Sequence, residues 1–273
     1  MTATTTIPWT EQDRTAVRTR SGDLRAVPSA MRSEWVKLTS LRANKVILAL
    51  TAGISAVIAG GLAATASPTD PALPASELFI YPLPLVAMLA AVAGILMFTS
   101  EAQHGILAAI LTARPARWVI VAAKTVTAVG VGLTLGVTGM AAGFAGSAIG
   151  GADLGGGLHL VTRGVWASLY IGLAALIGLG VGMMVRHTAA AISGLLMWSF
   201  VVESLFAPLL PDSVLHFLPF SAGYRLLDAG SQFEPPVLIA HQLSRPAYAL
   251  IFAGYAAVSL AIGTALLSRR DSN

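Results

Sequence analysis

Two polar features interrupt an otherwise apolar sequence and could carry chemistry: a cluster of polar residues and one isolated acid. Residues 100–118 read SEAQHGILAAILTARPARW, which brings a glutamate, a glutamine, a histidine and arginines together between two long apolar runs. The second feature is Glu203, a single acid inside the apolar run MWSFVVESLFAP. Carboxylates and imidazoles can transfer protons, bind metals or bind a charged partner, so each of the two features is a candidate functional site.

Covalent and metal chemistry are poorly supported by the rest of the sequence. The chain has no cysteine, which excludes disulfides, thiol nucleophiles and cysteine metal sites. Its five histidines are scattered without HExxH or comparable spacing, so we expect no metal site. GGADLGGG (150–157) lacks the Gly-Lys-Ser/Thr ending of a phosphate-binding loop, and Ser193-Gly194 lacks the first glycine of a GxSG nucleophile. We therefore expect no catalytic residue and no bound cofactor.

Composition predicts an all-α integral membrane protein. Of the 273 residues, 55% are hydrophobic and 11% charged, with a mean hydropathy of +0.75. Six runs are near or above the length of about 20 residues that crosses a bilayer. The six predicted spans are roughly 45–66, 78–99, 118–147, 164–185, 189–209 and 247–267.

Basic residues then predict the orientation. Fourteen of the 17 lysines and arginines fall in the tails and in the loops after spans two and four, which the positive-inside rule places in the cytoplasm. Both termini are therefore predicted to be cytoplasmic, and this asymmetry explains the net charge of +4 without a nucleic-acid partner. Residues 1–27 are polar and are predicted to form a disordered cytoplasmic tail.

Residues 28–44 are predicted to form an interfacial amphipathic helix. Met31, Trp35, Leu38 and Leu41 recur on one helical face, among basic residues that suit a membrane surface. Two interpretations stay open: an anchor that orients the first span, or an elbow helix that transmits motion from a cytoplasmic partner.

Small residues mark two predicted packing seams. Small side chains let helices approach closely in lipid, where no hydrophobic force drives association, although a pore lining is the alternative. The glycines concerned lie in spans three and four: Gly132, Gly136, Gly139, Gly143, Gly178 and Gly182.

Within the first cluster, the sequence predicts a short surface helix. Ser100 and Gln103 form an S-x-x-Q capping box, and Glu101 falls in the first turn, where a negative charge is favourable. Pro115 predicts that the helix ends near Ala113, which makes it about 12 residues or 18 Å long. Gly105 in its interior costs about 1 kcal/mol relative to alanine and suggests close approach of a partner protein.

Here the sequence resembles the permease subunits of ABC-2 type transporters. The matching pattern is Glu101, Gly105, an apolar helix, Pro115 with Arg117, and Ala123-Lys124 at the start of the third span. SEWVKLTSLR (33–42) and LHFLPFSAGYRLL (215–227) match in the same order along the chain. One departure is Ile106, where many members of the family carry threonine.

The resemblance implies that helix 101–113 is a coupling helix that docks on a separate ATP-binding cassette subunit, which binds the ATP and magnesium. Two such permeases would pair as a homodimer or heterodimer in a bacterial cytoplasmic membrane. The residues expected to contact the ATPase are Glu101, Ala102, Gln103, His104, Gly105, Leu107 and Arg114. An apolar path with few charges favours export of lipophilic drugs, lipids or amphipathic peptides.

Glu203 is predicted to lie in the outer half of the bilayer, about 22 Å from the cytoplasmic turn. An ionisable group there is costly, so a role in substrate passage or outer gating is one hypothesis. The other is a structural pair with Arg225 or His216.

The loop 210–246 is long and apolar, which predicts a re-entrant helical segment between spans five and six. The resemblance implies that such a segment closes the exit side of the path, where Phe217, Phe220, Tyr224 and Arg225 would act together with Glu203. The alternative is a simple amphipathic cap. An ion-coupled carrier or channel without an ATPase is the alternative function, and an immunity or signalling subunit on the same scaffold also stays open.

Overall fold

A computed structural model describes residues 42–66, 73–105, 117–206, 209–211, 214, 216–228 and 243–270. The predicted tail 1–27 and most of the predicted interfacial helix 28–44 lie outside these residues. The described part of the chain is helical throughout, with no strand. Its elements are α2 (Arg42–Ala64), α3 (Ala75–Leu78), α4 (Leu83–Gln103), α6 (Arg117–Ile149), α7 (Gly157–Val185), α8 (Thr188–Leu196), the π-helix η1 (Met197–Glu203), α9 (Ser204–Phe206), α11 (Pro219–Arg225) and α13 (Arg245–Arg270).

Five described helices are long and apolar enough to cross a membrane, which confirms a multi-pass helical membrane protein. They correspond to predicted spans one, two, three, four and six. Their bounds are Ala43–Ala64, Ala75–Gln103, Trp118–Ile149, Leu160–Val185 and Arg245–Arg269. The second helix continues past the predicted end at residue 99 because nothing in its sequence breaks the hydrogen-bond ladder before Gly105.

The predicted fifth span, 189–209, is the exception. Its apolar helix Thr188–Glu203 is shorter than the other five. At 1.5 Å per residue it reaches about 24 Å, less than the ~30 Å of a hydrocarbon core. α8 passes into the seven-residue π-helix η1, whose wider turns further shorten the rise. By length, the described chain therefore has five spans and one shorter apolar helix.

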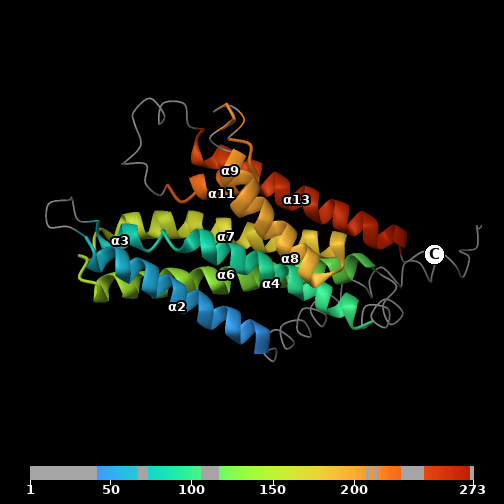
Figure 1. Ribbon diagram of the computed structural model, residues 1–273, viewed down its shortest axis with the longest axis horizontal. Coiled ribbons are helices and arrows are strands. Elements are labelled where there is room, and N and C mark those ends of the chain that lie inside the picture. Colours follow the sequence, from blue (N-terminus) through green and yellow to red (C-terminus); the bar gives the residue numbers. More distant parts are fainter. Residues whose placement is uncertain are drawn as a thin grey trace, which may run out of the picture.

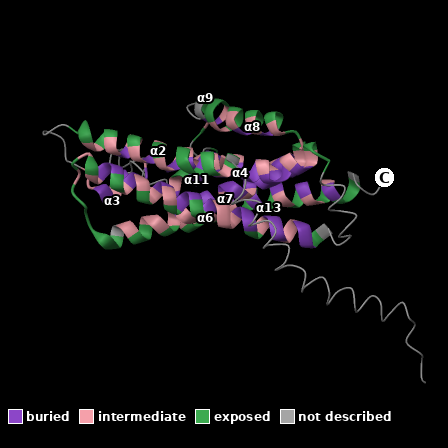
Figure 2. Ribbon diagram, turned by 90° about the horizontal axis from the view of Figure 1, so that it is seen from below, coloured by how far each residue is buried: buried purple, intermediate pink, exposed green. Residues whose placement is uncertain are grey.

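The helices form an elongated bundle with α4, α6 and α7 at its centre (Figure 1). α2 packs along α6, α13 packs along α7, and α8 crosses α4 and α7. Within the second span, 72% of an apolar stretch of 18 residues is buried, whereas the corresponding share is 22% in the first and last spans. Exposed apolar residues therefore gather on the outer helices, as expected where lipid replaces water (Figure 2).

Close contacts between helices give their directions. Gly178 opposes Ala91 and Gly182 opposes Ile95, so residue numbers rise in the same direction along both helices and α4 runs parallel to α7. The same test makes α2 parallel to α6 and α13 parallel to α7, with α6 antiparallel to α4 and α7. The described chain consequently begins and ends at the same end of the bundle, where α4 also ends (Figure 1).

Candidate functional site

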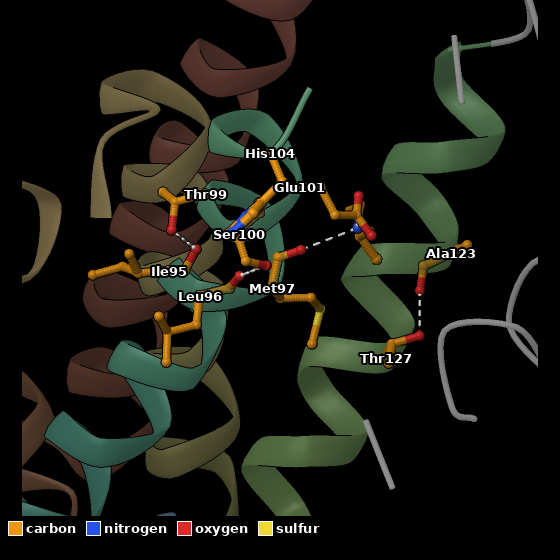
Figure 3. Close-up of polar contacts among 10 residues, drawn as sticks. Ile95, Leu96, Met97, Thr99, Ser100, Glu101, His104, Ala123 and Thr127 are labelled. Atoms are coloured by element: carbon orange, nitrogen blue, oxygen red, sulfur yellow. Dashed lines mark hydrogen bonds and ion pairs between the residues drawn. The ribbon is translucent and has the colours of Figure 1, made fainter. Parts of the chain in front are cut away.

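A buried ion pair joins α4 to α6 at this end of the bundle. Glu101 lies in the last turn of α4, and its Oε2 is 2.8 Å from Nζ of Lys124 in α6. Only 7% of Glu101 and 1% of Lys124 is exposed. Nζ of Lys124 also donates to the carbonyl oxygen of Met97 at 3.1 Å (Figure 3). A buried charge is tolerated only when it is paired in this way, so the two helices are joined where the segment 106–116 connects them.

Hydroxyl and amide groups join α8 to the same end of α4. Thr188 Oγ1 lies 2.8 Å from Oγ1 of Thr99 and 2.6 Å from Oε1 of Gln103. Thr99 in turn donates its own proton to the carbonyl oxygen of Ile95 at 3.0 Å (Figure 3). The end of α4 therefore contacts α6 through a charge pair and α8 through hydrogen bonds.

The predicted start of a new helix at Ser100 is wrong. Ser100 lies inside α4, and its hydroxyl donates to the carbonyl oxygen of Leu96 at 2.6 Å instead of capping a helix N-terminus. Glu101 is correspondingly in a last turn and not a first turn. α4 ends at Gln103, and Gly105, just past its C-cap His104, has a φ of +70°, the left-handed conformation that commonly follows a helix end.

Gly105 was also expected to lie in a helix interior, and this is wrong too. It follows the last turn of α4 with a positive φ that favours glycine, and within the chain a Cβ added there meets no atom within 4 Å. Ala102 is half-buried, whereas Gln103 and His104 are exposed. Leu107 and Arg114, with the rest of predicted helix 101–113, lie in 106–116 and outside the described residues.

Glu203 forms a second buried polar site about halfway along the bundle, where Gly223 of α11 packs against Tyr170 in the middle of α7. It is 4% exposed, and its Oε1 accepts from Trp198 Nε1 at 2.9 Å and from the backbone N–H of Phe220 at 3.0 Å. Oε2 accepts from the backbone N–H and the hydroxyl of Ser221, at 2.7 and 2.9 Å. Because Phe220 and Ser221 are in the first turn of α11, the carboxylate satisfies donors that a helix start leaves unpaired.

Glu203 accepts these hydrogen bonds from an indole, two backbone amides and a hydroxyl. His216 bonds elsewhere, since its Nδ1 lies 2.9 Å from the hydroxyl of Tyr248. Arg225 is at the opposite end of α11 from the amides that Glu203 binds. The π-helix explains the contact with Trp198, because a five-residue spacing places positions i and i+5 on one face. The acid was visible in the sequence, but its partners were not.

The predicted exit-side aromatic residues separate into one buried and two exposed side chains. Phe220 is 8% exposed and packs edge-on against Phe252, with ring centroids 6.3 Å apart. Phe217 and Tyr224 are 58% and 39% exposed. Phe217 contributes its carbonyl oxygen, which accepts from the hydroxyl of Tyr255 at 2.7 Å. α11 is thereby held to α13 as well as to Glu203.

All six predicted packing glycines lie at helix contacts. A Cβ at Gly178 would clash with the carbonyl oxygen of Ala91, and one at Gly182 would lie 2.9 Å from that of Ile95. Four further glycines line α6: Gly132 and Gly136 face α7, Gly139 faces α2 and α4, and Gly143 faces Phe79. Gly94 in α4 is an equally tight position that the sequence patterns missed, because it stands alone in its span.

Among the residues that the structure describes, no three His, Asp or Glu side chains come together in a way that could hold a metal ion. No protein-family model matches the sequence, and no curated protein matches it. Function is therefore inferred from the residues and from the two buried polar sites.

Proposed function

We propose that this chain is the permease subunit of an ATP-driven ABC-2 type exporter. It forms the translocation path with a second permease, and a separate ATP-binding cassette subunit supplies the hydrolysis of magnesium-bound ATP. The proposed location is a bacterial cytoplasmic membrane, with both termini and the segment 106–116 in the cytoplasm. Lipophilic drugs, lipids or amphipathic peptides are the proposed substrates.

The observation that carries this proposal is the buried pair between Glu101 and Lys124. The two residues lie on either side of the segment 106–116, and their ion pair of 2.8 Å between Oε2 and Nζ joins the helices that precede and follow it. A partner that pushes on this segment therefore moves the ends of α4 and α6 together. Since α4 belongs to the most buried of the five spans, such a displacement reaches the centre of the bundle and not merely its surface.

Two further features support the proposal. The ordered motifs from residue 33 to residue 227 follow the pattern of the family, as described above. The two described ends of the chain lie together with the end of α4, which fits six crossings if Thr188–Phe206 forms the fifth with local thinning of the bilayer. Most of the basic residues in the described part of the chain also belong to helix termini at this end, as the positive-inside rule requires for a cytoplasmic side: Arg42, Lys45, Arg117, Lys124, Arg186, Arg269 and Arg270.

Site-specific photo-crosslinking tests the proposal. A photoreactive residue at Ala102 or Leu107, in the native host's membranes, is expected to capture a soluble protein that carries a phosphate-binding loop, identified by mass spectrometry. The matched control is the same residue at Leu158, which is 80% exposed at the other end of the bundle and should capture no ATPase.

Capture of lipid or of the chain's own helices alone, from a protein that remains folded, contradicts the proposal. The segment would then be an interfacial linker, and the carrier or channel alternative would take its place.

A further inference from the structure

An apolar pocket of about 370 Å³ begins beside the Glu203 site at Trp198 and Phe220 and extends toward the turn between α7 and α8. α7 forms its floor, α8 with η1 and α13 form its two walls, and α11 closes one end. Residues from Ile177 to Val185 line it on α7, so it extends about 12 Å along the helices. Its size is within the range of ligand pockets, which are mostly apolar and concave.

The polar groups at this pocket are already engaged. The indole N–H of Trp198 donates to Glu203, and the hydroxyl of Ser259 donates to the carbonyl oxygen of Ala256 at 2.9 Å. The hydroxyl of Tyr255 donates to the carbonyl oxygen of Phe217. A ligand inside would find carbon surface and no free donor, which disfavours a polar or charged guest because its own groups would lose their hydrogen bonds.

The pocket keeps its shape through groups outside it. The π-helical turn sets Trp198 in one wall, and the hydrogen bond that the backbone N–H of Phe220 donates to Glu203 holds Phe220 at the closed end. Gly194 adds room in the wall formed by α8, since a Cβ there meets no atom within 4 Å. π-helical turns and buried intramembrane acids are both typical of functional sites, and here both adjoin the same pocket.

We propose that this pocket binds one hydrocarbon chain of a lipid or a lipid-like amphiphile, with its headgroup outside. The floor, α7, and one wall, α13, belong to membrane-spanning helices, so hydrocarbon surrounds the opening. Lipid tails are as apolar as the lining, so shape and dispersion contacts provide the selectivity. All the lining residues belong to one chain, so the site does not depend on the proposed ATPase partner.

The test uses the full chain reconstituted in phosphatidylcholine vesicles that contain a phospholipid with a diazirine in its acyl chain. After irradiation, mass spectrometry compares labelling at Trp198 and Tyr255 with labelling at Leu250, which is 75% exposed. The pocket residues are expected to label more strongly. Gly194→Phe should lower their labelling about tenfold, which corresponds to ~1.4 kcal/mol of occupancy.

Gly254→Phe is the matched control. Gly254 is also a helical glycine with no atom within 4 Å of an added Cβ, and it does not line the pocket. Its substitution should leave labelling unchanged. If Gly194→Phe fails to fold, Ile262→Trp fills the pocket from the opposite wall, at a position that is 46% exposed.

A second arm identifies the source of the chain. A single-chain amphiphile with a terminal diazirine is added to vesicles of ordinary phosphatidylcholine. Labelling of the pocket by this amphiphile indicates a lipid-like solute, whereas labelling by the phospholipid alone indicates a resident membrane lipid, and either result supports the chain-binding site. Labelling no stronger than at Leu250 and insensitive to Gly194→Phe overturns it. So does crosslinking of a photoreactive residue at Val258 to a second copy of the chain.

Discussion

Oε2 of Glu101 lies 2.8 Å from Nζ of Lys124, and the two residues belong to different helices that are joined by the segment 106–116. Both are almost completely buried, so neither charge can be satisfied by water if the other is removed. The pair therefore joins the C-terminal end of α4 to the N-terminal part of α6.

Glu101→Leu and Lys124→Met should each destabilise the protein by about 3–5 kcal/mol, because each leaves an unpaired buried charge. The double variant should recover most of that loss, since it removes both charges and keeps similar volume. Thermal unfolding of all four proteins in the same detergent gives the coupling. If the double variant instead loses the sum of the two single losses in stability, the two residues do not form a buried pair.

Glu203→Gln should loosen α11. The amide keeps one acceptor oxygen but turns an N–H₂ group toward donors, so at least one amide of Phe220 or Ser221 loses its partner, at about 1–3 kcal/mol. Hydrogen exchange at these two amides should accelerate. Ser221→Ala is the milder comparison, because it removes only the hydroxyl of the four donors to Glu203. Unchanged exchange in Glu203→Gln would mean that the carboxylate does not hold α11.

Gly178→Ala should destabilise the bundle by about 1–3 kcal/mol, because the added methyl meets the carbonyl oxygen of Ala91 on α4 and forces the two helices apart. Gly254→Ala is the matched control in α13. Its added methyl meets nothing within 4 Å, so the better helix propensity of alanine should stabilise it slightly. Unfolding midpoints measured side by side separate the two outcomes, and equal midpoints would refute the tight α4–α7 contact.

Gly105→Ala should be unfavourable by about 1–2 kcal/mol, because alanine resists the left-handed conformation. Gly105→Asn should be better tolerated, since asparagine enters that region more readily. A helix that continues past Gly105 also changes the direction in which segment 106–116 leaves α4. Crosslinking from Leu107 to the proposed ATPase should therefore fall more in the alanine variant than in the asparagine variant. The same yield in both would show that the turn at Gly105 does not direct the segment.

Much of the architecture follows from local composition. Runs of apolar residues predict membrane-length helices whatever their neighbours, since every backbone polar group in lipid must be satisfied within its own helix. Five of the six predicted spans appear as helices of that length. The need of Glu203 for polar partners could also be predicted, because a single acid in an apolar run is costly to bury unless it is hydrogen-bonded or paired.

Other features depended on tertiary contacts. The S-x-x-Q pattern at Ser100 predicts a helix start. The preceding residues are already helical, however, so Ser100 lies inside α4. The pairing of Glu101 with Lys124 and the capping of α11 by Glu203 join residues on separate elements, and the sequence carries no signal for which donors will meet a given carboxylate. Local propensity thus determined the helices and the need for polar partners. Only packing decided the partners, because the choice depends on distances between segments far apart in the chain.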